Sequence, residues 1–558
     1  MPSLGAAVRL DEFGTSFSTL SFWSVCALGV SLHVVGGRLI RGTPLAQVCY
    51  GPDLTTDAAA ACAKLQGEWT SLDRFLDDPV NVMSPYWMNR TCSPFAGPNG
   101  SCTLGNLASY AINVTAAEDA IAGVKFAQSN NVRLIVKNTG HDFLGRSSGK
   151  GALALWTHNL KKTSFLNYKS SFYTGPAMRI GAGITNIEMY EAAHAKGYRA
   201  VGGSCPTVGA GGGYTQGGGH GPLGSKYGLG ADQVLEYEVV TAAGKHMTAS
   251  PTQNADLYWA LAGGGPGNLA VILSVTAKAY RDGPIAGAGF SFANTGDNYW
   301  AAISAWLRHL LVLDTIEGFG TLWAFTALGF QLQYATLPDA KAAQIAAALS
   351  PFLDEVKALN VTVANDVAND HPNFLGHYNA WATQTYDTNN SVGGRLIPRS
   401  VVQKDLPALV SVFRDIVVNS GNVGGSAISG ISANVTHKRV GNTGASNSVV
   451  PAWRDSLFTI TVGIPLNRDA GWDEMNRGQV QLNAWQDQLR AVTPGGGTYM
   501  NEATYDNPNW KSDYYGSNYN KLLSVKIKYD PHHLFWTNAA VGSDLYWKVA
   551  TDGRLCRV

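Results

Sequence analysis

Two glycine-rich stretches hold the side chains whose types could do chemistry. Residues 201–230 contain thirteen glycines and one cysteine, Cys205, and residues 137–151 place His141 in a polar loop. Glycine at such density would weaken a helix or strand by roughly 0.5–1 kcal/mol per residue, but it lets the backbone lie against a flat ligand with its N–H groups turned toward it. We therefore expect a large flat ligand to contact the main chain here.

Three other chemistries find weaker support in the sequence. Residues 265–270 fit the pattern G-x-G-x-x-A, but a helix precedes them and a strand follows, which reverses the dinucleotide-binding fingerprint. Ser204 lacks the second glycine of a nucleophile elbow. The histidines at 371, 377, 532 and 533 show no metal-ligand spacing on a recognisable helix, so no metal site is predicted. Cys205 by itself could be an unpaired structural thiol.

The polar loop around His141 follows a predicted β-α-β unit. Residues 111–114 are typical of a strand, Thr115 and Glu118 of a capping box, 117–131 of an amphipathic helix, and 132–136 of a second strand. A second capping box, Thr185 with Glu188, precedes a helix that Gly197 can end. Strands are expected at 178–184, 234–240 and 269–280, and a short helix at 255–262.

The chain divides into five predicted parts. Residues 1–44 form an N-terminal segment, 45–106 a loop-rich part with paired cysteines, and 107–285 an α+β domain. Residues 286–495 mix long amphipathic segments, at 339–359 (interrupted at Pro351) and 467–492, with strands such as 456–464. This pattern favours an antiparallel sheet covered by helices on one side and roofing the first domain. Residues 496–558 return to a polar, aromatic style.

Charge and cysteines limit the partners and the compartment. Forty-one basic and 40 acidic residues leave a net charge of +1, which argues against nucleic acid and anionic membranes as partners. Cys49 and Cys62, and Cys92 and Cys102, favour two short disulfide loops and an oxidising compartment, although spacing leaves the connectivity open. Residues 14–37 resemble a signal peptide's apolar middle but lack a clean cleavage site, so secretion stays open.

Taken together, Cys205, the Asn138–Asp142 loop and the downstream GGGPGN resemble one family. They are similar to the vanillyl-alcohol oxidase (VAO) type flavoprotein oxidases, with a PCMH-type FAD-binding domain, in the berberine-bridge-enzyme-like branch. Fungal isoamyl alcohol oxidases look closest, and the resemblance covers residues 45 to 555. It implies FAD bound through two covalent bonds, from His141 to the 8α-methyl and from Cys205 to C6 of the flavin.

The resemblance also assigns further residues to the cofactor. The 138–142 backbone would hold the pyrophosphate as an anion nest, and Tyr214 or His220 would face the flavin, because the stretch 211–221 is one residue longer than in many relatives. The remaining expected cofactor contacts are Asn138, Thr139, Gly140, Asp142, Ser147, Ser148, Val208, Gly209, Gly212, Gly264, Gly267, Asn268, Val271, Tyr515, Asn518 and Tyr519.

The catalytic base is expected in the segment Tyr499-Met-Asn501-Glu502. Tyr499 and Asn501 match the family pattern, whereas Glu502 replaces a second tyrosine, so either Tyr499 or Glu502 could serve as the base, with Tyr499 slightly favoured. Glu502 could equally be a solvated or salt-bridged carboxylate. Valine at position 208 is associated in the family with oxidases, which implies reoxidation by O2 and release of hydrogen peroxide.

Three functions follow as hypotheses. The first is a secreted, monomeric FAD oxidase that takes a hydride at flavin N5 from an alcohol, hemiacetal or similar CH–OH centre of a small alcohol, saccharide or natural product. The second is a flavin-dependent tailoring enzyme of secondary metabolism that oxidises or cyclises its substrate. The third is a catalytically silent carbohydrate-binding or wall protein. None of the three requires nucleic acid or stable membrane association.

Overall fold

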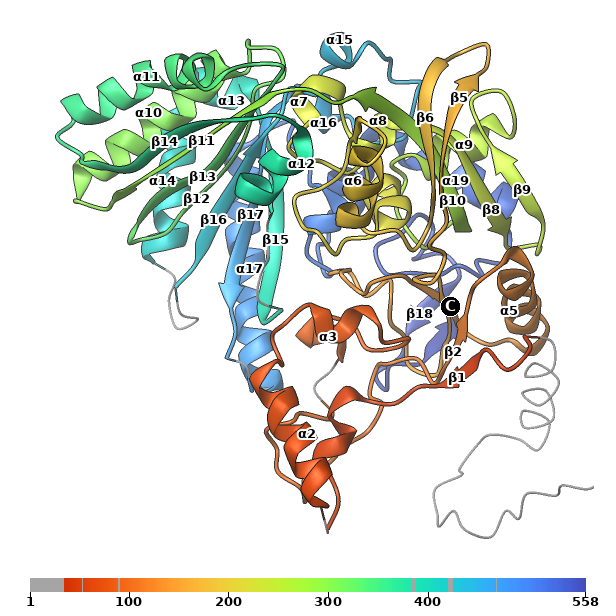
Figure 1. Cartoon of the computed structure of the whole chain (residues 1–558). Helices are drawn as coiled ribbons and strands as arrows, with labels where there is room; N and C mark the ends of the chain where they lie inside the picture. The colour runs from red at the N-terminus through yellow and green to blue at the C-terminus, as the bar shows by residue number, and fades with distance from the viewer. Residues whose placement is uncertain (1–34, 53, 89–90, 384–387, 420–424, 468) are drawn as a thin grey trace, which may run out of the picture.

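The computed structural model describes residues 35–558, apart from 53, 89–90, 384–387, 420–424 and 468. The architecture is α+β, as predicted, with one group of sheets at the right of Figure 1 and a larger helix-covered sheet at the left. Most of the apolar stretch at 14–37 lies outside the described residues. Among the helices that are described, none combines the length and apolar character needed to cross a membrane.

The first sheet carries the loop that contains His141. Its order is β1 (Leu39–Arg41), β2 (Tyr110–Asn113), β4 (Leu153–Trp156) and β3 (Leu134–Lys137). Helix α5 (Ala117–Asn130) joins β2 to β3, which confirms the β-α-β unit, although β4 lies between the two strands and pairs parallel with both. The α5 capping carboxylate is Asp119 rather than Glu118, because Asp119 accepts the N–H groups of Thr115 and Ala116.

The second sheet positions the glycine stretch. Its order is β5 (Thr163–Lys169), β6 (Thr174–Gly181), β10 (Ala270–Arg281), β8 (Val234–Thr241) and β9 (His246–Ala249), and β7 (Tyr198–Ala200) also pairs with β10. The predicted strand at 178–184 ends earlier, at Gly181. Helix α6 (Asn186–His194) begins at the predicted capping box, where Glu188 accepts the Thr185 N–H at 2.8 Å. Helix α9 (Ala255–Leu261) agrees with the sequence.

The third sheet has seven strands, and all of its pairings are antiparallel. Its order is β14 (Val363–His371), β11 (Ile285–Ala293), β13 (Gly329–Pro338), β12 (Gly320–Phe325), β16 (Ala427–Ser432), β17 (Ser456–Pro465) and β15 (Asn390–Pro398). Helices α10 (Asp297–Leu313), α11 (Ala342–Ala358), α14 (Leu406–Val418) and α17 (Trp472–Val492) supply side chains to a core that they share with the sheet.

The two faces of this sheet differ, as a half-covered sheet requires. Trp323 of β12 is fully buried in the core shared with the helices, whereas its neighbour Leu322 lines a cavity on the other side. Helix α11 is continuous through Pro351, against the predicted interruption, because flanking residues such as Phe352 and Leu349 anchor both sides in the core. Helix α17 begins at Trp472, five residues later than predicted.

The N-terminal part is held by two disulfide bonds. Cys49 pairs with Cys62 and Cys92 with Cys102, which confirms the predicted loops. This part contains η1 (Leu45–Cys49), α2 (Thr56–Gly67), α3 (Asp73–Leu76) and α4 (Pro85–Met88), and it lies below the two groups of sheets in Figure 1. The C-terminal part contains η5 (Met500–Glu502), α18 (Trp510–Tyr515), η6 (Gly516–Asn518), α19 (Tyr519–Tyr529), β18 (Trp547–Val549) and β19 (Leu555–Arg557).

Candidate active site

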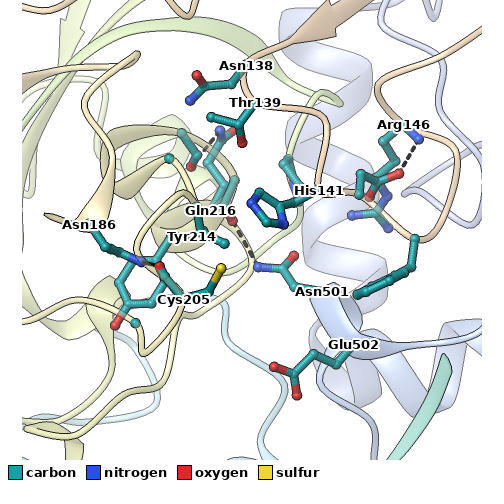
Figure 2. Close-up of a pocket in the computed structure, with 18 of the residues that line it drawn as sticks. Asn138, Thr139, His141, Arg146, Asn186, Cys205, Tyr214, Gln216, Asn501 and Glu502 are labelled. Atoms are coloured by element: carbon teal, nitrogen blue, oxygen red, sulfur yellow. Dashed lines mark hydrogen bonds between the residues drawn. The ribbon is translucent and has the colours of Figure 1, made fainter. Parts of the chain in front are cut away.

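A cavity of about 430 Å³ lies where the His141 loop, the glycine stretch, the seven-stranded sheet and the 499–502 segment meet (Figure 2). The sheet contributes its uncovered face, including Leu322, Ser429 and Thr461. Most of the residues predicted from the sequence line this cavity: Asn138, Thr139, Gly140, His141, Asp142, Ser147, Cys205, Val208, Gly209, Gly212, Tyr214, His220, Gly267, Tyr499, Asn501 and Glu502.

The 138–142 loop lines the cavity as it leaves β3. Gly140 has a φ of 91°, which a residue with a side chain rarely adopts. The Asp142 carboxylate accepts the backbone N–H of Arg146, so it fixes the turn from within rather than reaching across the cavity. Burial raises the pKa of Asp142, and the Arg146 charge and the loop N–H groups oppose that rise. The Asp142 carboxylate therefore holds this turn beside the cavity.

The Asn138 side chain leaves no room for side chains at the two glycines that face it, Gly209 and Gly212. Its Nδ2 donates to the Ala182 carbonyl at 2.7 Å. A Cβ on Gly209 would lie 2.1 Å from that nitrogen, and one on Gly212 would lie 2.7 Å from it, so neither position accommodates a side chain while the amide stays in place. The glycines let the stretch pack directly over the end of β3.

His141 and Cys205 approach the cavity from different loops and share a neighbour, Thr207. The Thr207 hydroxyl lies 2.8 Å from Nε2 of His141 and 3.5 Å from Sγ of Cys205. Burial lowers the pKa of His141 to about 3, with the nearby Lys137 charge adding to the effect, so the imidazole is neutral. Burial raises the pKa of the Cys205 thiol, although hydrogen bonds to Thr207 and to the Val208 backbone work in the other direction.

The opposite side of the cavity carries a histidine–carboxylate pair and a buried tyrosine. His220 Nε2 lies 2.8 Å from Glu502 Oε1, and Asn501 Nδ2 donates to the Tyr499 hydroxyl at 2.9 Å and to the Gly213 carbonyl at 3.0 Å. Burial raises the pKa of Tyr499 far above its usual value, and the charge of Glu502 raises it further.

Comparison with known proteins places this geometry in a family. A model described as "FAD binding domain" matches residues 108–250, and one described as "Berberine and berberine like" matches residues 498–542. The VAO-type flavoprotein oxidase VAO615 of Thermothelomyces thermophilus is 41% identical over 536 residues, which cover 94% of this chain and 91% of that protein. The chain belongs to the VAO-type FAD-linked oxidoreductases.

Two further relatives frame the family. The bifunctional decalin synthase calF of Penicillium decumbens is 39% identical over 575 residues, covering 100% of this chain and 98% of the relative. The crystal structure of the VAO-type flavoprotein MtVAO615 from Myceliophthora thermophila C1 superposes with a TM-score of 0.91 at 38% identity, covering 98% of this chain and 100% of that one. The predicted family and enzyme class are thus confirmed, while the likeness to isoamyl alcohol oxidases stays a prediction.

Seven of the predicted contacts do not line the cavity of this VAO-type chain. Ser148 is buried, and its hydroxyl donates to the Asn106 carbonyl at 2.6 Å. Val271 points to the opposite side of β10 because its neighbours Ala270 and Ile272 face the cavity, and strand side chains alternate. The Asn268 carbonyl accepts from Lys526 Nζ at 2.6 Å. Tyr515 donates to the Ala539 carbonyl, and Asn518 donates to the Ser448 and Val449 carbonyls. The Tyr519 hydroxyl accepts from the Gly542 N–H. Gly264 packs against Ala260 and Leu522.

Sequence reasoning missed residues that the family fold brings to the cavity. Arg146 is only 2% exposed and lines the cavity beside the 138–142 backbone, and its Nη2 donates to the Ala539 carbonyl. An arginine five residues after His141, next to a predicted anion nest, was a signal that could have found it. Asn186 and Gln216 also line the cavity, and Asn186 Nδ2 donates to the Cys205 carbonyl at 2.9 Å. No local sequence pattern predicted that either residue would line the cavity.

The cavity fits FAD on its own chemistry. Buried polar atoms of its lining residues lack a hydrogen-bond partner within the described chain: Oδ1 of Asn138, the hydroxyl of Tyr214, Oε1 of Gln216, Nδ1 of His220 and Oε2 of Glu502. Unpaired buried groups of this kind are costly unless a ligand satisfies them. A buried arginine beside backbone N–H groups suits a pyrophosphate, and the glycine wall leaves room for a flat ring system.

Proposed function

We propose that the protein is an oxidase that holds FAD through two covalent bonds, one to His141 and one to Cys205. The observation that carries the proposal is that these two side chains, 64 positions apart in the sequence, line one cavity and contact one hydroxyl. A glucooligosaccharide oxidase of Acremonium strictum, which shares the fold at 19% identity with a TM-score of 0.64, is described with 6-S-cysteinyl, 8α-N1-histidyl FAD. That description supports the same pair of linkages here.

FAD, when bound, accepts a hydride at N5 from a CH–OH carbon and passes the electrons to O2, which gives hydrogen peroxide. The chain must then supply a base for the hydroxyl proton. We assign this role to Glu502, oriented by His220. One carboxylate oxygen is held by the imidazole, and the other, Oε2, has no partner within the described chain and belongs to a residue of the cavity wall.

Tyr499 fits this role less well than Glu502. Its pKa is raised by burial and raised further by the nearby carboxylate, so the phenolate that a base requires is disfavoured twice. Its hydroxyl accepts the Asn501 amide, which can hold Tyr499 as a neutral donor toward a substrate oxygen. We therefore propose Tyr499 and Asn501 as residues that orient the substrate, and Glu502 as the base.

The roof of the cavity supports a hydroxylated substrate. Gln333, Ser429, Thr459 and Thr461 bring amide and hydroxyl groups to the uncovered face of the seven-stranded sheet. Such groups bind hydroxyls of a saccharide or polyol, or of a natural product, by hydrogen bonds. We propose that Val208, which lines the cavity three residues after Cys205, leaves the access to O2 that an oxidase needs. The two disulfides support an oxidising compartment, which we propose to be the secretory pathway.

A tailoring role in secondary metabolism is the second candidate. It is favoured by relatives named decalin synthase calF and FAD-linked oxidoreductase patO of Penicillium expansum, which are 39% and 38% identical. A substrate panel separates the two candidates. Alcohols, oligosaccharides and polyketide-like scaffolds are incubated with the enzyme in aerated buffer, and peroxide and product are measured together. Product formation with matching peroxide from a simple alcohol or saccharide supports the first candidate, and turnover confined to the scaffolds supports the second.

Stopped-flow reoxidation tests the oxidase assignment directly. The enzyme is reduced anaerobically and mixed with aerated buffer, and the return of flavin absorbance is followed. Fast reoxidation with peroxide release is expected. Reoxidation as slow as that of a flavin dehydrogenase would show that O2 is not the acceptor.

A further inference from the structure

We propose that Thr207 is a positioning residue that prepares both His141 and Cys205 for covalent attachment to the flavin. The inference rests on the proposed bicovalent FAD and adds a residue to it. Its basis is a shared contact: the Thr207 hydroxyl is the common neighbour of His141 Nε2, at 2.8 Å, and of Cys205 Sγ, at 3.5 Å. One hydroxyl thus contacts both side chains that must form bonds.

The donor and acceptor capacity of a hydroxyl decides how hydrogen bonds can run from His141 through Thr207 to Cys205. A threonine hydroxyl donates one hydrogen and accepts others, so it can accept from the His141 Nε2–H while it donates to the Cys205 sulfur. In that arrangement Nε2 carries the imidazole proton, and Nδ1 is the ring nitrogen whose lone pair can attack the flavin. The sulfur receives a donor at the same time, which stabilises its thiolate form.

Burial affects the protonation states of His141 and Cys205 in different ways, and the Thr207 contacts act on both residues. Burial keeps His141 neutral, with its pKa lowered to about 3, and the neutral ring is the form that can attack. Burial works against the Cys205 thiolate by raising the pKa of the thiol, and the Thr207 hydroxyl, its backbone N–H and the Val208 N–H act against that rise. Thr207 therefore supports the thiolate with both its side chain and its main chain.

The backbone around Thr207 is held on both sides, so the main chain that carries its side chain keeps its position. The first N–H groups of α6 donate to the carbonyls of its two neighbours: Ile187 to Pro206 at 3.1 Å, and Asn186 to Val208 at 2.9 Å. The Asn186 side chain also donates to the Cys205 carbonyl at 2.9 Å. Helix α6 thereby fixes the segment from 205 to 208 against the cavity.

The covalent chemistry balances with O2 as oxidant. Each linkage replaces one C–H bond of the flavin and one N–H or S–H bond of the protein with a C–N or C–S bond. Two protons and two electrons are released per linkage, and O2 takes them up as hydrogen peroxide. Thr207 gains and loses nothing overall, since it only orients the imidazole and the thiol.

The test compares Thr207→Val, which removes the hydroxyl at nearly constant shape, with Thr207→Ser, which keeps it. Each protein is purified with excess FAD and sampled over time, and acid-precipitated peptides are analysed by mass spectrometry for flavin on residues 141 and 205. In Thr207→Val we expect the Cys205 linkage to form about tenfold more slowly or worse, since a hydrogen bond to the thiolate is lost. The His141 linkage should slow as well, because the imidazole loses the hydroxyl that orients it. Thr207→Ser should restore both rates.

The outcomes separate the inference from the function on which it rests. If the unmodified protein carries no covalent flavin, the proposed bicovalent attachment fails. If the unmodified protein carries both linkages and Thr207→Val forms both at the same rate, the role of Thr207 is overturned while the function stands. If Thr207→Ser is as slow as Thr207→Val, keeping the hydroxyl does not restore attachment, which also overturns the role of the hydroxyl. Thermal unfolding and noncovalent FAD content of each variant report folding independently of linkage.

Discussion

Replacing Gly209 by alanine drives a methyl group into the Asn138 amide. The new Cβ would lie 2.1 Å from Asn138 Nδ2, so the amide must withdraw by about 1.3 Å to reach an ordinary contact of 3.4 Å. It would then lose its 2.7 Å hydrogen bond to the Ala182 carbonyl. Gly209 itself has a φ of −69°, which alanine adopts freely, so the cost is steric and not conformational.

The lost hydrogen bond sets the magnitude. Leaving a buried carbonyl without its donor costs about 1–3 kcal/mol, so Gly209→Ala should lower the free energy of unfolding by that amount. Asn138→Ala removes the same hydrogen bond and should cost about as much. The double variant should lose no more than Asn138→Ala alone, because the methyl group no longer meets an amide. The two effects are therefore expected to be strongly non-additive.

Urea unfolding followed by tryptophan fluorescence measures the four proteins of this cycle. Gly478→Ala in α17 is the control, since its Cβ would meet Leu466 at an ordinary 3.5 Å, and this helical change should leave stability unaltered or raise it by up to about 1 kcal/mol. Additive losses in the double variant would refute the clash between residues 209 and 138. A loss in the control as large as that of Gly209→Ala would refute the use of these contact distances.

Four other outcomes are expected. Glu502→Gln should lower kcat about 10²- to 10⁴-fold in peroxide assays with the identified substrate, whereas Tyr499→Phe should lower it less than tenfold; the reverse order would restore Tyr499 as the base. Burial, with the neighbouring His371, lowers the pKa of His377 to about 3. Below about pH 6.5 the unfolded chain therefore binds a proton at His377, whereas the folded chain does not. The free energy of unfolding falls as the pH is lowered, by about 3 kcal/mol between pH 7 and pH 4.5. His377→Gln should remove this part of the acid sensitivity in thermal unfolding at pH 7 and 4.5, and an unchanged pH dependence would contradict it. Replacing both Cys49 and Cys62 by serine opens a loop with a sequence separation of 13 and should cost about 3 kcal/mol in urea unfolding, and an unchanged midpoint would show that the loop is held by packing alone. Val208→Leu should slow stopped-flow reoxidation by O2, and a rate equal to that of the unmodified enzyme would remove Val208 as the oxygen gate.

The sequence predicted the parts of the fold that depend on local pattern. Strand periodicity located β8 and β10 within a residue or two, and the capping box at Thr185 located the start of α6, because alternation and helix starts are local properties. It placed the start of α17 five residues too early and broke α11 at Pro351. There the packing of neighbouring residues against the sheet decides the outcome, and that packing is not local.

The residues of the site could also be predicted only in part. His141 and Cys205 could be found because their loops carry family motifs, and the structure brings both to one cavity. Val271 lies on the side of β10 that faces away from the cavity, and a single sequence shows alternation but not which set of side chains faces a ligand. Arg146 and Thr207 were missed because their roles come from contacts across loops.

The central claim is that FAD is joined to both His141 and Cys205, and peptide mapping of the intact protein tests it most directly. The protein is precipitated with acid and digested, and flavin-bearing peptides are identified by mass spectrometry. The account predicts a yellow pellet and one flavin that links the peptide containing residue 141 to the peptide containing residue 205. Flavin released into the supernatant, or attached to neither residue, would contradict it.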